Sequence, residues 1–128
     1  DNFRLEKYIY NMPEWEACAD IVICRAGAMT LSEIAAAGKA AIIVPSPYVA
    51  ENHQFINAKQ LADAGAAVLI EEKELTSERL ERELDALISS EKKRLETSAK
   101  IRAFAHPDAR ETIYAGLCEL ASRGAESR

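Results

Sequence analysis

The chain has 128 residues, 48% of them hydrophobic, and a formal net charge of -5. This size allows one ordinary hydrophobic core, and the acidic balance argues against a nucleic-acid partner, which needs clustered Lys and Arg. The three cysteines lack the spacing of a metal site or of a disulfide framework, so we expect reduced thiols, no metal and no bound cofactor.

Two further features bear on the context of the chain. No apolar run approaches the roughly 20 residues that a membrane-spanning helix needs, so we expect a chain that is soluble by itself. The first residue is Asp1 rather than Met, and a strand-like segment follows it directly. We therefore expect a piece of a larger protein.

The first 70 residues alternate apolar runs with helical patterns. Strands are predicted at residues 3–9, 21–24, 41–44 and 66–70, where apolar residues cluster and turn residues follow. Helices are predicted between them, at residues 12–19, at residues 30–37, and in a segment that ends at Gly65.

Three helical segments are predicted after residue 70. Apolar residues lie on one face of the first segment (Leu80, Leu84, Leu87 and Ile88) and of the last (Ile113, Leu117, Leu120 and Ala121). The charged residues between 91 and 100 are typical of a solvated helical face. The whole pattern predicts an α/β fold, with a Rossmann-like parallel sheet, flanking helices and an all-helical C-terminal segment. Ligands of such sheets bind beyond the carboxyl ends of the strands.

The segment from Cys24 to Gly38, CRAGAMTLSEIAAAG, joins a strand, a turn of small residues and a helix. Small residues let the backbone approach a ligand closely, and the first turn of a helix offers free N–H groups to an anion. Thr30 and Glu33 also have the spacing of a capping box, which needs no ligand. From spacing alone, Glu33 is equally well interpreted as a cap or as a ligand carboxylate.

Residues 19–70 resemble the donor-binding half of the MurG family of glycosyltransferases. The resemblance rests on the run CRAGAMTLSEIAAAG, on the VPSP loop that follows it and on HQFINA. It implies that residues 1–128 are a UDP-sugar-binding fragment of the C-terminal domain in a two-domain GT-B fold, with the acceptor-binding N-terminal domain absent. The implied activity of the parent is inverting transfer of N-acetylglucosamine from UDP to a lipid-linked muramoyl pentapeptide in peptidoglycan synthesis.

The resemblance assigns the UDP group to the start of the predicted helix. Glu33 matches the carboxylate that accepts hydrogen bonds from the two ribose hydroxyls. Ala28, Met29 and Thr30 match positions whose backbone N–H groups, with the Thr hydroxyl, contact the diphosphate. Gly27 would let the backbone approach closely.

Four other positions receive roles from the same resemblance. Arg25 would neutralise phosphate charge, although a structural ion pair is equally well supported. Ile9 matches the position whose backbone recognises uracil, and it can be a core residue as well. His53 and Gln54 match the pair that contacts sugar hydroxyls. Many family members have Gln where this chain has His53, and a surface residue at a helix start is the alternative for that position.

The resemblance also bears on partners and location. We identify no catalytic base in the chain, so turnover requires the absent domain, which would also bind the acceptor lipid. The parent is expected to be cytoplasmic and peripheral on the cytoplasmic face of the bacterial membrane. Because the family sheet has central strands before this segment, an exposed sheet edge is expected to pair with a second copy of the chain.

Two alternatives to this function remain open from the sequence. The chain could be the donor-binding module of another GT-B transferase or of a sugar-nucleotide epimerase, in which case binding would be indifferent to the N-acetylglucosamine group. It could also be a non-catalytic subunit that needs a separate acceptor-binding chain.

Overall fold

A computed structural model describes residues 2–49 and 52–126, so positions 50 and 51 of the predicted loop after the third apolar run lie outside the described residues. The centre of the fold is a parallel sheet of β1 (Ile21–Cys24), β2 (Ala40–Ile43) and β3 (Val68–Leu69), in the order β1-β2-β3. Ile21 is paired with Ala40 and Ile42 with Val68, which fixes the register.

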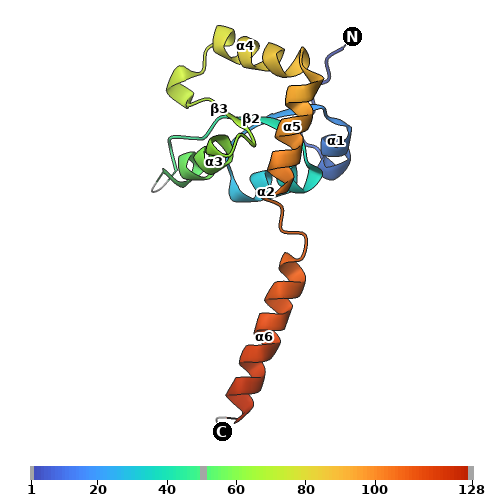
Figure 1. Cartoon of the computed structure of the whole chain (residues 1–128), viewed down its shortest axis with the longest axis vertical. Coiled ribbons are helices and arrows are strands. Elements are labelled where there is room, and N and C mark those ends of the chain that lie inside the picture. The colour runs from blue at the N-terminus through green and yellow to red at the C-terminus, as the bar shows by residue number, and fades with distance from the viewer. Residues whose placement is uncertain (1, 50–51, 127–128) are drawn as a thin grey trace.

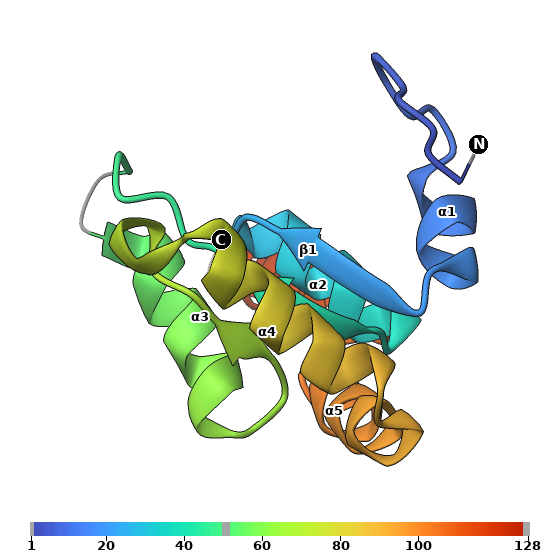
Figure 2. The same cartoon turned by 90° about the horizontal axis from the view of Figure 1, so that it is seen from above.

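Helices cover both faces of this sheet (Figures 1 and 2). On one face, α2 (Ala28–Ala37), α3 (His53–Asp63) and α5 (Glu91–Arg102) share a core cluster with the strands. On the other face, α4 (Ser77–Ile88) contributes Leu87 to a second cluster with Ile42 and Ile70. The short 3-10 helix η2 (Glu72–Glu74) connects β3 to α4. The α/β class and the parallel sheet with flanking helices are thus confirmed.

The central strand β2 explains why the sheet needs two helical layers. All four of its residues are buried. Successive side chains of a strand point to opposite faces, and accordingly Ala41 and Ile43 belong to one core cluster while Ile42 and Val44 belong to the other. A continuous apolar run of this kind is typical of a parallel strand that is buried on both faces.

Helix α2 begins earlier than the sequence predicts. Gly27 is its N-cap residue and Ala28 its first residue, so Thr30 lies inside the first turn. The predicted capping box of Thr30 and Glu33 is therefore wrong, because the cap position is occupied by glycine and no side chain caps this end. The predicted end is confirmed: Gly38 has a left-handed φ of 63° at the C-cap, a conformation that glycine adopts without steric cost.

The predicted strand at residues 3–9 is not formed. This segment has no regular structure, and Phe3, Leu5 and Tyr8 are exposed. A strand requires hydrogen bonds from a neighbour, and the segment runs away from the sheet before α1 (Met12–Cys18), as Figure 2 shows. Its contacts are local, including Arg4 over the ring of Trp15 at 4.9 Å.

The last helix, α6 (Ala109–Glu126), projects away from the rest of the molecule (Figure 1). Its predicted apolar face is present in the sequence but uncovered, since Ile113, Leu117 and Leu120 are all exposed. The all-helical character of the C-terminal segment is confirmed. Among the described residues, no helix is both long and apolar enough to cross a membrane.

Candidate functional site

The three strands end at one edge of the sheet, and an arginine connects these ends. Arg25 follows β1 directly, and its Nη1 atom donates to the carbonyl of Val44, just after β2, at 3.3 Å. The same nitrogen forms an ion pair with the carboxylate of Glu72, which follows β3. The hydrogen bond from Arg25 lowers the pKa of Glu72 and raises that of Arg25 itself, so both groups stay charged.

Gln54 holds the loops after β1 and β2 together. Its side-chain oxygen Oε1 accepts a hydrogen bond from the backbone N–H of Ala26 at 3.3 Å and from that of Ser46 at 2.9 Å. Both lone pairs of this oxygen are thereby used, and only the amide nitrogen remains to donate to a ligand. Gln54 lies in the first turn of α3 and is half-buried, so α3 positions the start of α2.

The first turn of α2 leads away from this junction. The first hydrogen bond within the helix runs from the N–H of Leu31 to the carbonyl of Gly27 at 3.0 Å. The N–H groups of Ala28, Met29 and Thr30 therefore take no part in the hydrogen bonds within α2. The positive end of the helix dipole lies at these groups. Met29 has an exposed side chain, so the turn is accessible from solvent.

Glu33 lies one turn further along α2 and faces α1. Together with Glu16 and Ala17 of α1 it lines a cavity of about 510 Å³, whose other walls are Pro13, Ala36, Ala37 and Lys39. Glu33 is exposed, and within residues 2–49 and 52–126 no donor is hydrogen-bonded to its carboxylate. The cavity size lies within the range of about 300–1,000 Å³ that is typical of ligand pockets.

Glu16 is the buried member of this carboxylate pair. Its side chain is only 9% exposed. Burial, and to a smaller extent the charge of Glu33, raises the pKa of Glu16. Burial also raises the pKa of the neighbouring Cys24 thiol to about 11, with Glu16 contributing, so this cysteine is a protonated thiol at neutral pH.

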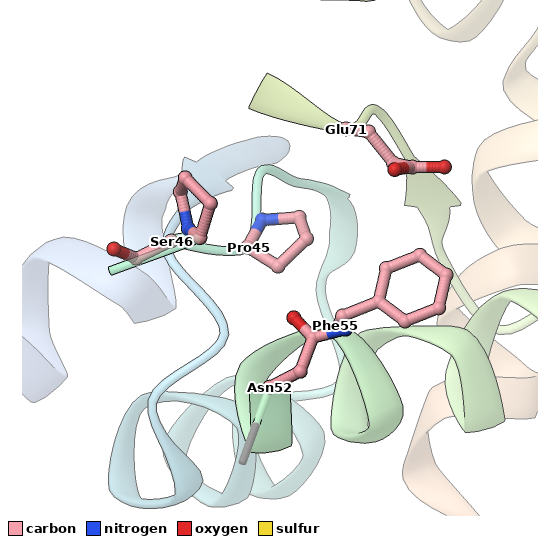
Figure 3. A pocket seen from close by; sticks show the side chains of 6 residues that line it. Pro45, Ser46, Asn52, Phe55 and Glu71 are labelled. Atoms are coloured by element: carbon pink, nitrogen blue, oxygen red, sulfur yellow. The ribbon is translucent and has the colours of Figure 1, made fainter. Parts of the chain in front are cut away.

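A second, smaller cavity lies at the carboxyl edge itself, between the loop after β2 and the start of α3 (Figure 3). Its volume is about 90 Å³, and Pro45, Ser46, Asn52, Phe55 and Glu71 lie around it, with Pro47. A water molecule occupies about 30 Å³ of liquid, so this cavity holds a few waters rather than a hexose. A sugar at this edge would lie on the open surface.

The predicted site residues fall into one connected group and one separate residue. Hydrogen bonds or chain continuity connect Arg25, Gly27, Ala28, Met29, Thr30, Glu33, His53 and Gln54 at the start of α2 and α3. His53 is the exposed first residue of α3, as its surface alternative requires. Ile9 is half-buried and belongs to the segment before α1, outside the sheet.

The sequence analysis missed two residues of this edge. Glu72 pairs with Arg25 although 47 positions separate them, and the backbone N–H of Ser46 is held by Gln54. A signal for Glu72 exists, because it is one of a run of acidic residues directly after the last predicted strand. That run places a carboxylate at the same sheet edge as Arg25, but it does not say which of its members makes the pair.

Comparison with known proteins places the chain in a family. The model of the glycosyltransferase family 28 C-terminal domain matches residues 1–113. The chain belongs to this family. The family 28 match includes all three strands and every predicted site residue.

Two relatives of this chain have the same name. A protein from Alkaliphilus metalliredigens is 49% identical over 114 residues, which are 88% of this chain and 31% of that protein. One from Burkholderia multivorans is 43% identical over 128 residues, or 99% of this chain and 34% of that protein. Both are named as UDP-N-acetylglucosamine--N-acetylmuramyl-(pentapeptide) pyrophosphoryl-undecaprenol N-acetylglucosamine transferase. The chain thus spans about a third of the length of these relatives.

A solved structure agrees with the fold. The crystal structure of Acinetobacter baumannii MurG matches 86% of this chain and 31% of its own length, with a TM-score of 0.78 and 37% sequence identity. The family 28 chain is therefore similar to the C-terminal part of MurG, and the resemblance inferred from the motifs is confirmed.

Proposed function

We propose that this chain binds the donor UDP-N-acetylglucosamine as part of an inverting N-acetylglucosaminyltransferase of peptidoglycan synthesis. The observation that carries the proposal is the start of α2, where three backbone N–H groups and, one turn on, the carboxylate of Glu33 have no hydrogen-bond partner within residues 2–49 and 52–126. Membership of family 28 and the names of the relatives support this assignment. Residues 1–128 then act as the donor-binding part, and a further domain binds the acceptor.

The diphosphate is proposed to lie at the first turn of α2. The N–H groups of Ala28, Met29 and Thr30, with the Thr30 hydroxyl, would donate to its oxygens, and Gly27 has no side chain to obstruct its approach. Transfer of the sugar leaves negative charge on the departing UDP, which the helix dipole stabilises. This chain thus assists departure of the leaving group, while the base that activates the acceptor comes from elsewhere.

The nucleoside is proposed to lie between α1 and α2. Glu33 would accept hydrogen bonds from both ribose hydroxyls, and the cavity of about 510 Å³ beside it provides the space. The backbone of Ile9, three residues before α1, would meet the uracil. His53 and the free amide nitrogen of Gln54 would then contact the sugar hydroxyls on the open edge of the sheet.

Two further proposals concern the location of the parent protein and the association of the isolated chain. We propose that the parent protein works at the cytoplasmic face of the membrane, through a part outside this chain; the lipid-linked acceptor in the names of the relatives supports a place at a membrane. The free edge of β1, which pairs only with β2 among the described strands, is proposed to associate with a second copy when the chain is isolated.

Calorimetric titration of the chain with UDP tests the proposed function. We expect Glu33→Ala to weaken binding at least about tenfold, because two hydrogen bonds to a charged acceptor are lost. Glu96→Ala makes the same charge change on the exposed face of α5 and is expected to bind as the wild type does. If the wild type does not bind UDP, or if Glu33→Ala binds equally well, the proposal is wrong.

The sugar specificity is tested in the same experiment. UDP-N-acetylglucosamine should bind more tightly than UDP-glucose if the surface beside His53 and Gln54 contacts the N-acetyl group, because the two donors differ only in the substituent at C2 of the sugar. Equal affinity for the two would favour another GT-B transferase or a sugar-nucleotide epimerase.

A further inference from the structure

We propose that Glu72 is an internal competitor of the diphosphate for Arg25: the carboxylate holds the guanidinium in the donor-free chain and yields it when a nucleoside diphosphate binds. This inference rests on the proposed function, because it concerns the anion at the start of α2. It adds a residue that regulates how tightly that anion is held and how readily it leaves.

The position of Arg25 makes it available to both partners. It lies three residues before the first residue of α2 and two before the N-cap Gly27. Its side chain is 52% exposed, so the guanidinium is accessible to an anion from solvent. Nη1 already contacts Val44 and Glu72. A guanidinium also carries N–H donors at Nε and Nη2, which are of the kind that bind phosphate oxygens.

The ion pair is of a kind that can be exchanged. Both side chains are partly exposed, so water and salt screen their attraction, and pairs of this type contribute little to stability. The second contact of Arg25, to the Val44 carbonyl, is long at 3.3 Å. A diphosphate offers a larger negative charge and several acceptor oxygens, and it gains the helix dipole at the same time.

The neighbouring charges single out Glu72 for this role. Glu71 is occupied by Lys73, whose Nζ atom lies 2.9 Å from its carboxylate. Tyr48 also contributes to raising the pKa of Arg25, but it carries a phenol and not a carboxylate. Glu72 is therefore the carboxylate that neutralises Arg25 in the free chain. Without it, the full charge of Arg25 would be directed to the bound diphosphate.

The consequence is a balance between affinity and release. While Glu72 is bonded to Arg25, a diphosphate must displace it, so the affinity for UDP is lower than the site could provide. After transfer of the sugar, Glu72 can take Arg25 back and so assist the departure of UDP. Removal of the carboxylate alone should therefore tighten UDP binding and slow UDP dissociation.

A double-mutant cycle with UDP titration tests the competition. Glu72→Gln keeps the size of the side chain and should raise the affinity for UDP about three- to tenfold. Arg25→Gln should lower it about tenfold, and adding Glu72→Gln to Arg25→Gln should change it by less than about twofold. Glu74→Gln removes the same charge two residues away and controls for general electrostatics, with an expected change below about twofold.

A second readout does not depend on variants. In the wild-type chain, carbon-detected NMR of the Glu72 carboxyl should give a lowered pKa without UDP, and this pKa should rise toward its ordinary value when UDP saturates the chain. The inference is overturned if UDP leaves the pKa of Glu72 unchanged, or if Glu72→Gln fails to tighten binding while the wild type binds UDP through Glu33. If the wild type does not bind UDP at all, the proposed function fails first and this inference with it.

Discussion

At the scale of single residues, Glu16 has an environment that opposes its ionisation. It is 9% exposed and shares a cavity with Glu33. Burial and the nearby charge raise its pKa above 4.5 in the folded chain. In the unfolded chain the carboxyl ionises at its ordinary pKa, so its ionisation favours the unfolded state as the pH rises through the folded pKa.

We therefore expect Glu16→Gln to stabilise the chain in a pH-dependent way. At pH 4 and below, the carboxyl is largely protonated in both states and the variant should resemble the wild type. At pH 8 the variant should melt at a higher temperature than the wild type, because its side chain carries no charge to be buried on folding. Thermal unfolding followed by circular dichroism measures this difference.

The control for Glu16→Gln is Glu14→Gln, a change at an exposed position of the same helix. It should leave the pH dependence of the melting temperature as it is in the wild type. A Glu16→Gln variant that melts at the same temperature as the wild type at pH 8, or lower, would show that the buried carboxylate does not oppose folding.

The sequence could predict the kind of chemistry at single positions but not their partners. It predicted that Arg25 and Glu33 are charged groups at the ligand-binding edge of the sheet. For Arg25 it left a phosphate contact or an ion pair open, and for Glu33 a ligand contact or a helix cap. The structure pairs Arg25 with Glu72 and removes the capping interpretation of Glu33. Neither result follows from local spacing, because the first joins positions 47 apart and the second depends on where α2 begins.

At the scale of elements, the buried strands were the most predictable and the covering helices less so. The runs at β1 and β2 are apolar throughout, and Gly38 and Gly65 end helices as expected. In α5, the charged sequence predicts a solvated face, yet Ile101 is fully buried in the core and Thr97 is buried too. Two apolar or small residues among many charged ones give too weak a pattern to be recognised as a packing face.

The failed strand at residues 3–9 has a different cause. Its apolar residues are typical of a strand, but composition alone does not supply the neighbour whose N–H and C=O groups complete a strand. No strand of the described sheet runs beside this segment (Figure 2). On the same reasoning, β1 has one edge without a partner among the described strands, and Ile23 on this strand is 48% exposed.

We expect the edge of β1 to cause concentration-dependent association of the isolated chain. Sedimentation velocity should detect a dimer that grows with concentration, and Ile23→Lys should abolish it, since a charged side chain on an edge strand opposes pairing. Ile113→Lys tests whether the exposed face of α6 is responsible instead, and it should leave the dimer intact. A chain that sediments as a monomer at every concentration would contradict this expectation.

At the scale of the whole molecule, the chain is a three-layer α/β unit with a helix that extends from it (Figure 1). Its family, fold class and the position of the candidate site were predictable because the motif CRAGAMTLSEIAAAG is long and local. The proposed donor site combines loops after β1 and β2, the start of α3 and the groove beside α1. The chain spans about a third of the length of its relatives, which is why the acceptor is part of the proposal and not of the described site.

The most direct test of the central claim is the nitrogen–proton correlation spectrum of the labelled chain, recorded while UDP is added. The account predicts that the largest shifts occur at the backbone amides of Ala28, Met29 and Thr30, with smaller shifts at Glu33 and Gln54. Shifts confined to another region, such as the surface pocket that Asp20 and Gly38 line together with Arg94 of α5, would contradict the claim that the start of α2 holds the diphosphate.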